Sequence, residues 1–311
     1  MSSPAIQRPG VLEFSILIAL AAMWGNSFVL TKWVVTEVHP ASLAMIRTLG
    51  GGVILLLAAL VLSRPISRKL SDWVVMIASA ILGNAIPFVL IGWGQAKVNA
   101  GLGAVLMGVM PLMTLVLAHF FSKGEALKLR SLIGVLLGLI GLVVLVGPSV
   151  LYDLGNEGVR QIAFLGAAFC YALNIILTRW VGHLDPIAFS AVIITGAGVL
   201  LMPFGIPPLL SDALLISTEN WLYILILVLF PTALAAILLF ILVRRVGVNF
   251  FSQVNYLVPI SGVAWGWALA NEVIEPELAL ALLFILGGIA LSRRRAEPHN
   301  SVSSTPQGRQ I

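Results

Sequence analysis

The chain has 311 residues, of which 59% are hydrophobic and only 10% are charged. A soluble domain carries roughly 25% charged residues, so this sequence has too little polar surface to cover a water-exposed globule. The formal net charge of +5 comes from residues in short loops, a pattern that argues against a nucleic-acid-binding surface. The single cysteine, Cys170, excludes an intrachain disulfide framework.

Ten apolar runs are each long enough to form a helix across a membrane. A hydrocarbon core of about 30 Å needs roughly 20 helical residues, and such a run must be helical because lipid offers no partner for an unpaired backbone group. The first run follows Arg8 and is too long for the apolar core of a signal peptide. The expected helices are 11–35, 40–62, 72–93, 99–121, 129–149, 160–180, 186–206, 219–243, 249–269 and 277–293.

The basic residues of the loops predict how these helices are oriented. With the N-terminus in the cytoplasm, 14 of the 18 lysines and arginines lie on the cytoplasmic side, and only Lys32, Lys97 and Arg160 lie outside. Cytoplasmic loops carry the excess of Lys and Arg, so we expect both termini in the cytoplasm and the chain in a bacterial inner membrane. Residues 1–10 would form a short cytoplasmic tail, and the polar residues 296–311 a disordered one.

The two halves of the sequence resemble each other at offsets of 146 to 148 residues. Each half holds five expected helices, an odd number, so the second half must enter the membrane from the opposite side. We therefore expect one repeat over 11–149 and an inverted repeat over 160–293. Inverted repeats are typical of alternating-access carriers, whose substrate site lies near the membrane midplane between the repeats. The matching residues are Trp24 and Tyr171, Thr31-Lys32-Trp33 and Thr178-Arg179-Trp180, Pro40 and Pro186, Pro111 and Pro259, Glu125 and Glu272, and Gly141 and Gly288.

Several of these segments also resemble a known family. The stretches WGNSF at 24–28 and LAMIRTLGGG at 43–52, and the spacing of Pro111 and Glu125 before a glycine-rich helix, are similar to the ten-helix EamA branch of the drug/metabolite transporter superfamily. The resemblance covers about residues 12–293. It implies a basket in which helices one to four and six to nine surround a central cavity, while helices five and ten form a supporting pair. Within the branch, the chain is most similar to aromatic amino-acid exporters of the YddG type.

The resemblance implies export of small metabolites, and we expect amino acids that are aromatic or large and neutral. A broad drug/metabolite carrier, or one for substrates like nucleotide sugars, is the alternative within the family. An enzyme embedded in the membrane is the alternative from another class, and the histidine spacing argues against it because it offers no metal site. We expect no cofactor, no nucleic-acid partner, and a monomer or homodimer. The histidines are His39, His119, His183 and His299.

Arg47 is the only strongly basic residue well inside an expected helix. A charge at the middle of a membrane helix costs roughly 2.5–3.5 kcal/mol on insertion scales, so it should face protein or water. Arg47 could bind a substrate carboxylate. Alternatively, it could be a structural residue near the outer end of its helix, bonded to carbonyls or reaching towards the interface.

The other candidate binding residues are aromatic, amide or small side chains within the expected helices. Trp24, Ser27 and Thr31 share one face of the first helix at spacings of three and four. Tyr171 and Asn174 share the corresponding face of the sixth. Such faces suit an amphipathic metabolite, although packing between helices would equally use these residue types. The remaining candidates, with the same alternative, are Asn84, Phe88, Met107, Gln253 and Tyr256.

Two further features of the helices bear on the mechanism. Proline removes a helical hydrogen bond and permits a kink, so Pro87, Pro111, Pro231 and Pro259 are candidate hinges. No Asp or Glu lies deep within an expected helix, although a proton-driven pump usually keeps one there. The sequence therefore favours facilitated diffusion or weak coupling.

Overall fold

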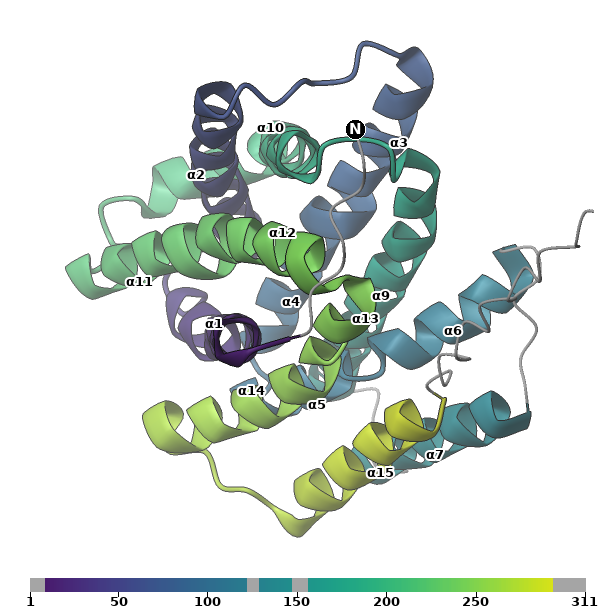
Figure 1. Cartoon of the computed structure of the whole chain (residues 1–311). Helices are drawn as coiled ribbons and strands as arrows, with labels where there is room; N and C mark the ends of the chain where they lie inside the picture. Colours follow the sequence, from purple (N-terminus) through teal and green to yellow (C-terminus); the bar gives the residue numbers. More distant parts are fainter. Residues whose placement is uncertain (1–8, 122–128, 147–155, 293–311) are drawn as a thin grey trace, which may run out of the picture.

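The structure is a computed structural model that describes residues 9–121, 129–146 and 156–292, and every regular element within them is a helix (Figure 1). Two of these elements, η1 and η3, are π-helical, and η2 is a 3-10 turn. In chain order the elements are α1 (Val11–Val34), α2 (Pro40–Val61), α3 (Leu70–Ala80), η1 (Ile81–Ala85), α4 (Ile86–Gln95), α5 (Ala100–Met107), α6 (Met110–Phe121), α7 (Leu129–Val146), α9 (Asn156–Thr178), η2 (Arg179–Val181), α10 (Pro186–Asp212), α11 (Thr218–Val228), η3 (Leu229–Leu234), α12 (Ala235–Val246), α13 (Val248–Phe251), α14 (Val254–Ala270) and α15 (Pro276–Ser292).

The prediction of an all-helical membrane protein is confirmed. A helix occupies each of the ten predicted segments. Within the described residues, seven helical runs have the length and apolar composition needed to cross a bilayer. The apolar helices Leu132–Gly141 and Pro276–Leu291 are shorter, and α14 has 17 residues. The count of ten spans is therefore confirmed only in part.

Three predicted helices differ in extent from those observed. The segment 99–121 is divided at Gly108 and Val109 into α5 and α6. Pro111 lies in the first turn of α6, where a backbone N–H has no partner within the helix, so the lack of an N–H costs no hydrogen bond. The segment 249–269 is divided into α13 and α14. The segment 186–206 continues through two further prolines to Asp212, because neighbouring helices can satisfy the backbone groups that proline frees in a membrane helix.

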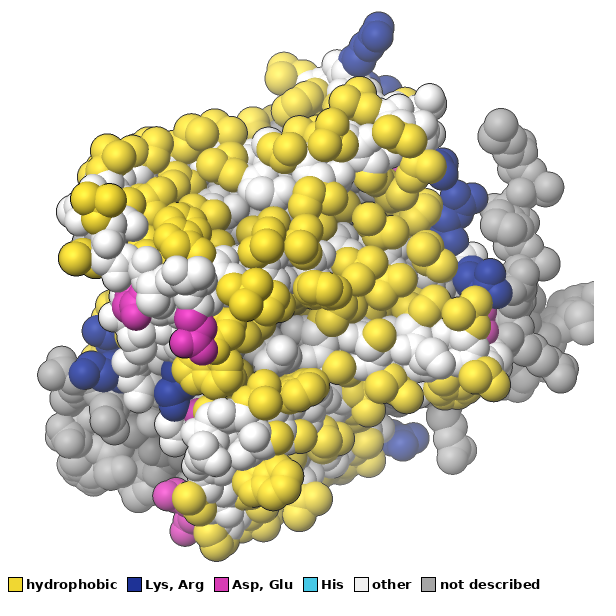
Figure 2. Space-filling view, turned by 90° about the vertical axis from the view of Figure 1, so that its left-hand side faces the viewer, with side chains coloured by type: hydrophobic (Ala, Val, Ile, Leu, Met, Phe, Trp, Pro, Cys, Tyr) yellow, Lys and Arg dark blue, Asp and Glu magenta, His cyan; other side chains and the backbone are white. Residues whose placement is uncertain are grey.

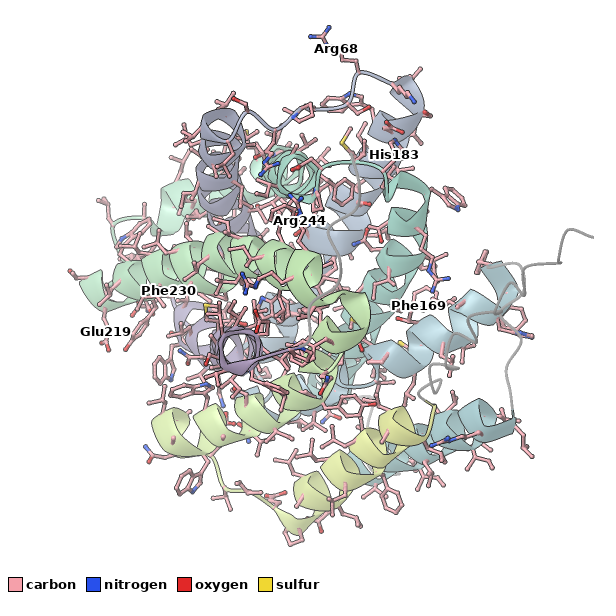
Figure 3. All side chains as sticks on the ribbon, in the orientation of Figure 1. Arg68, Phe169, His183, Glu219, Phe230 and Arg244 are labelled. Atoms are coloured by element: carbon pink, nitrogen blue, oxygen red, sulfur yellow. The ribbon has the colours of Figure 1, made fainter. Side chains whose placement is uncertain are left out.

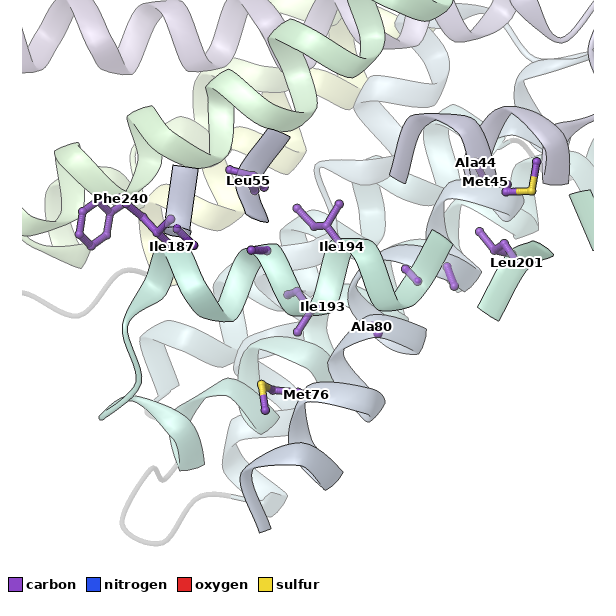
Figure 4. Packing of buried hydrophobic residues seen from close by; sticks show 14 residues of the cluster. Ala44, Met45, Leu55, Met76, Ala80, Ile187, Ile193, Ile194, Leu201 and Phe240 are labelled. Carbon is purple, nitrogen blue, oxygen red and sulfur yellow. The ribbon is translucent and has the colours of Figure 1, made fainter. Parts of the chain in front are cut away.

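The two repeats meet where α2 packs along α10 (Figure 4). A Cβ on Gly52 of α2 would lie 2.4 Å from the Thr195 hydroxyl of α10, and a Cβ on Gly198 of α10 would lie 2.6 Å from the Leu49 side chain of α2. Each helix therefore uses a glycine to admit a side chain of the other. The apolar cluster around this contact includes Leu55 and draws side chains from both repeats.

The helices α7 and α15 form a separate pair, seen together at the lower edge of Figure 1. A Cβ on Gly288 would lie 2.4 Å from the carbonyl oxygen of Gly134 and 2.9 Å from the amide nitrogen of Gly138. A Cβ on Gly141 would lie 2.9 Å from the carbonyl oxygen of Ala281. Small residues let the two backbones touch, as is common between membrane helices. This arrangement agrees with the expected supporting pair.

The glycine contact between α7 and α15 predicts different effects at two adjacent positions. Gly288→Ala is expected to lower the free energy of unfolding by about 1–3 kcal/mol, because the new methyl group must push backbone apart. Gly287 is the matched control, since a Cβ added there would have no neighbouring atom within 4 Å. Gly287→Ala should leave stability unchanged or raise it by up to about 1 kcal/mol through helix propensity. Unfolding of the purified variants in detergent measures both, and equal losses would contradict the packing argument.

The surface of the bundle is suited to lipid. Large apolar side chains such as Ile18, Leu57 and Val74 are more than half exposed, at 61%, 57% and 62%. Figure 2 shows hydrophobic side chains covering most of one face, with charged groups towards its margins. A soluble protein rarely exposes so large an apolar area. The chain is therefore a multi-pass membrane protein.

Candidate functional site

The two π-helical segments occupy corresponding places in the two repeats. The segment η1 interrupts the run from α3 to α4, and η3 interrupts the run from α11 to α12; they begin at Ile81 and Leu229, 148 residues apart. Phe230, labelled in Figure 3, marks the position of η3 between α11 and α12. π-Helical turns within α-helices are frequent at functional sites. Four of the polar or aromatic candidates, Trp24, Arg47, Asn84 and Asn174, lie in these two segments or contact them.

Arg47 is the buried cation of this region. Its side chain reaches from α2 to η3, where Nε donates a hydrogen bond to Oγ1 of Thr232 at 2.8 Å. The Arg47 guanidinium carbon lies 4.3 Å from the ring centroid of Phe88 in α4, a cation–π contact. The residue is 8% exposed. Among the described residues, no carboxylate forms an ion pair with Arg47.

Trp24 joins α1 to the same segment. Its indole Nε1 donates to the carbonyl oxygen of Pro231 at 3.2 Å, and its ring packs edge-on against Phe251 with centroids 6.2 Å apart. Pro231 and Thr232 are neighbours in the chain, so Trp24 and Arg47 are held by consecutive residues of η3. The Ser27 hydroxyl donates locally to the Trp24 carbonyl at 2.7 Å.

The second repeat supplies α9 to this region. Tyr171 is near enough to Arg47 for an electrostatic interaction between their polar groups. Asn174, one turn further along α9, packs on η1, since a Cβ on Gly83 would lie 2.4 Å from Asn174 Nδ2. The residue after Gly83, Asn84, is buried. The Oδ1 atom of Asn174 is buried without a hydrogen bond in the described part of the chain.

Other predicted site residues are not connected to Arg47 by the contacts of the described residues. Met107 packs against an apolar cluster that includes Phe28. Tyr256 packs against a different cluster, which includes Val109. Thr31 is buried in α1, and Gln253 directly precedes α14. Their roles in binding stay predictions, as do the hinge roles of the four prolines.

A polar network that the sequence did not predict joins α1, the start of α5 and the loop after α14 at the predicted outer end of α1. Lys32 Nζ donates to Glu272 Oε1 at 2.8 Å and to Asn99 Oδ1 at 2.7 Å. The amides of Ala100 and Gly101, in the first turn of α5, also donate to the Glu272 carboxylate, at 2.6 and 2.9 Å. Glu272 therefore caps α5 and pairs with α1. The repeat-related match with Glu125 was the only sequence signal for it.

Two further carboxylates hold α1 and its following loop. At the predicted inner end, Arg245 Nε of α12 donates to Glu13 Oε1 at 2.7 Å. In the loop after α1, the Glu37 carboxylate accepts the amide of Ser217 at 2.8 Å. Hydrogen bonds from Asn220 and Ser217 lower the pKa of the Glu37 carboxyl. These carboxylates lie near helix ends, as does Glu219 at one end of α11 in Figure 3.

A helical membrane fold with two repeats, whose polar residues meet between them, defines a multi-pass membrane transporter. The family model of EamA-like transporters matches residues 12–147 and 160–294. The chain therefore belongs to the EamA-like transporter family, and it moves small molecules across a membrane.

Relatives with transporter names match most of the chain. It is 24% identical to the uncharacterized transporter YvbV of Bacillus subtilis, over 96% of each chain. It is 27% identical to the uncharacterized inner membrane transporter YedA of Escherichia coli, over 89% of each. A chloroplastic WAT1-related protein of Arabidopsis thaliana is 27% identical over 84% of this chain, which covers 64% of that protein. A solved crystal structure shares the fold with a TM-score of 0.62 at 19% identity, covering 90% of this chain and 96% of that one.

Proposed function

We propose that this protein is a bacterial inner-membrane carrier that exports amino acids, aromatic or large and neutral, by facilitated diffusion. Arg47 binds the substrate carboxylate. Phe88, Tyr171 and Trp24 supply aromatic surface for the substrate side chain. Asn174 and Asn84 offer amide groups to the substrate amine.

The observation that carries the proposal is that Arg47 is buried and that no carboxylate of the described residues forms an ion pair with it. A buried cation is costly unless an anion or several hydrogen bonds compensate it. Among the described residues, Arg47 contacts the Thr232 hydroxyl and the Phe88 ring and interacts electrostatically with Tyr171, and none of these groups is a carboxylate. A substrate carboxylate would supply the missing anion and can accept two parallel hydrogen bonds from a guanidinium.

The surroundings of Arg47 favour an amphipathic substrate over a polyanion. Phosphorylated substrates carry more charge than one guanidinium neutralises, and among the described residues Arg47 is the only Lys or Arg away from the helix ends. Aromatic rings bury large apolar areas and pack well against other rings. A zwitterion with a large apolar side chain satisfies both conditions.

The coupling mechanism follows from the positions of the acids. Within the described parts of the chain, the acids lie near helix ends or in loops, among them Glu13, Asp72, Glu219 and Glu272. A carboxylate at the centre of a carrier would give a coupling proton a place to bind. The substrate gradient alone is therefore expected to drive transport.

Purified protein reconstituted in liposomes tests this function. Phenylalanine, tryptophan, leucine and their amides, which lack the carboxylate, are supplied outside at equal concentration. We expect the free acids to equilibrate faster than in empty liposomes and the amides to enter no faster. An imposed pH gradient should produce no accumulation. Absence of amino-acid flux would overturn the substrate assignment, and uphill uptake that follows the pH gradient would overturn facilitated diffusion.

A further inference from the structure

The break in the helix at η3 frees a backbone carbonyl next to Arg47. Pro231 has no N–H, so the Leu227 carbonyl, four residues earlier, cannot receive its α-helical hydrogen bond. The Thr232 hydroxyl donates to this carbonyl at 2.8 Å instead. The proline therefore fixes the direction of the Thr232 hydroxyl proton.

A hydroxyl that has donated its single proton can only accept further bonds. Thr232 Oγ1 accepts the Nε–H of Arg47 at 2.8 Å, which gives a directed chain from Arg47 through Thr232 to Leu227. Thr232 is 5% exposed, so water does not compete freely for these bonds. This bond uses only the Nε–H of the guanidinium, so the N–H groups of the two terminal nitrogens are left for another acceptor.

Close packing holds η3 against α2. A Cβ on Gly51 would lie 2.6 Å from Thr232 Cγ2, so the glycine lets the threonine approach one helical turn from Arg47. The Phe88 ring lies against the guanidinium, 4.3 Å from its carbon. The hydroxyl and the ring together restrict both the rotation and the tilt of the guanidinium plane.

We propose that Thr232 is a positioning residue for Arg47: its hydroxyl, oriented by the carbonyl that Pro231 frees, aims the terminal nitrogens of the guanidinium at the substrate carboxylate. The proposal rests on the proposed function, because it needs a substrate that carries a carboxylate. The second repeat thereby orients a binding residue of the first. Arg47 has five donors in a rigid fork, so its orientation determines whether a carboxylate can be bound by two bonds.

Thr232→Val and Thr232→Ser test the proposal in liposomes. Valine keeps the shape but has no hydroxyl, whereas serine keeps the hydroxyl. We expect Thr232→Val to raise the KM for the transported amino acid about tenfold, the size expected for one hydrogen bond to a charged group, with a smaller change in kcat. Thr232→Ser should stay within about twofold of the native KM. Thr48→Val is the matched control, since Thr48 is buried on α2 but its hydroxyl bonds only backbone carbonyls of its own helix.

A double variant separates positioning from a general structural effect. In the Arg47→Gln background, Thr232→Val should cause no further loss, because there is no guanidinium left to orient. Additive losses, or a Thr232→Val defect in kcat alone, would overturn the proposal. So would failure of Thr232→Ser to restore the native KM.

A measurement without substrate keeps this proposal distinct from the proposed function. In protein with ¹⁵N-labelled arginine, the Nε–H signal of Arg47 is identified by its loss in Arg47→Gln. We expect slow exchange of this proton with water in native protein and Thr232→Ser, and fast exchange in Thr232→Val. If native protein carries no amino acid, the proposed function falls. Slow exchange in Thr232→Val would overturn the positioning role whatever the substrate.

Discussion

Arg47→Gln is expected to reduce amino-acid flux in liposomes by between about 30-fold and a few thousandfold. This range corresponds to the roughly 2–5 kcal/mol lost when one partner of a buried charge pair is removed, at about 1.4 kcal/mol per tenfold. Initial rates of uptake of the free amino acids measure it, with empty liposomes as the baseline.

The same variant is expected to be as stable as the native protein, or more stable. Burying the charge costs roughly 2.5–3.5 kcal/mol on insertion scales. Its contact with Phe88 returns about 0.5–2 kcal/mol, and its bond to Thr232 returns about 1.5–3 kcal/mol. These contributions nearly cancel, so glutamine, which can still bond to the threonine, should not lower the unfolding temperature. Loss of flux without loss of stability is the signature of a binding residue.

Two control variants test this expectation. Arg47→Lys keeps the charge but lacks the planar fork and the Nε donor, so its flux should lie between those of the native protein and Arg47→Gln. Arg244 also lies over an aromatic ring, 5.3 Å from the centroid of Phe240, but is exposed at the end of α12. Arg244→Gln should leave flux unchanged. If Arg47→Gln instead lowers the unfolding temperature together with the flux, Arg47 is structural.

The sequence predicts Arg47, Trp24 and Tyr171 as binding residues because strongly polar or aromatic groups stand out within apolar helices, and their role in binding stays a prediction. It could not connect Arg47 to Thr232, which is 185 residues away. A 3.6-residue period assigns each residue of a helix to a face, but a π-turn contains an extra residue and rotates the faces that follow. The position of Thr232 relative to α2 therefore depends on a break whose type the sequence does not reveal.

The lengths of the apolar runs in the sequence predicted where the helices lie, but not where each helix is interrupted. The helix α10 continues through Pro207 and Pro208, whereas Gly108 and Val109 divide α5 from α6. Whether the backbone around such a proline finds further partners depends on neighbouring helices; near Pro207, for example, the Ser42 hydroxyl of α2 donates to the Gly205 carbonyl of α10 at 2.7 Å. Such partners come from distant parts of the chain. The ends of the helices were predictable to a few residues. Candidate hinge prolines lie at or beside three internal breaks, with Pro87 after η1, Pro111 after the break between α5 and α6, and Pro231 in η3, but Pro259 lies inside α14 without a break.

Glu272→Gln is expected to give the largest loss of stability among the charged residues at the predicted outer end. The carboxylate accepts three hydrogen bonds, from Lys32, Ala100 and Gly101, and its side chain is 9% exposed. Glutamine has one acceptor oxygen, so its amide group would face a donor. Each lost bond to a charged group costs roughly 1.5–3 kcal/mol, towards the lower limit here because the Lys32 side chain is 27% exposed. Unfolding in detergent measures the loss, with exposed Glu275→Gln as the control.

Exchange of the two charges distinguishes a helix cap from a simple ion pair. If Glu272 served only to pair with Lys32, the double variant Lys32→Glu with Glu272→Lys would regain most of the stability that either single change removes. The amides of Ala100 and Gly101 would instead face a lysine in that variant, and a cation at a helix N-terminus is unfavourable. We therefore expect the exchanged protein to be no more stable than Glu272→Gln. Lys32→Met should cost less than Glu272→Gln, because it leaves the carboxylate bound to both amides; rescue by charge exchange would show that the ion pair alone matters.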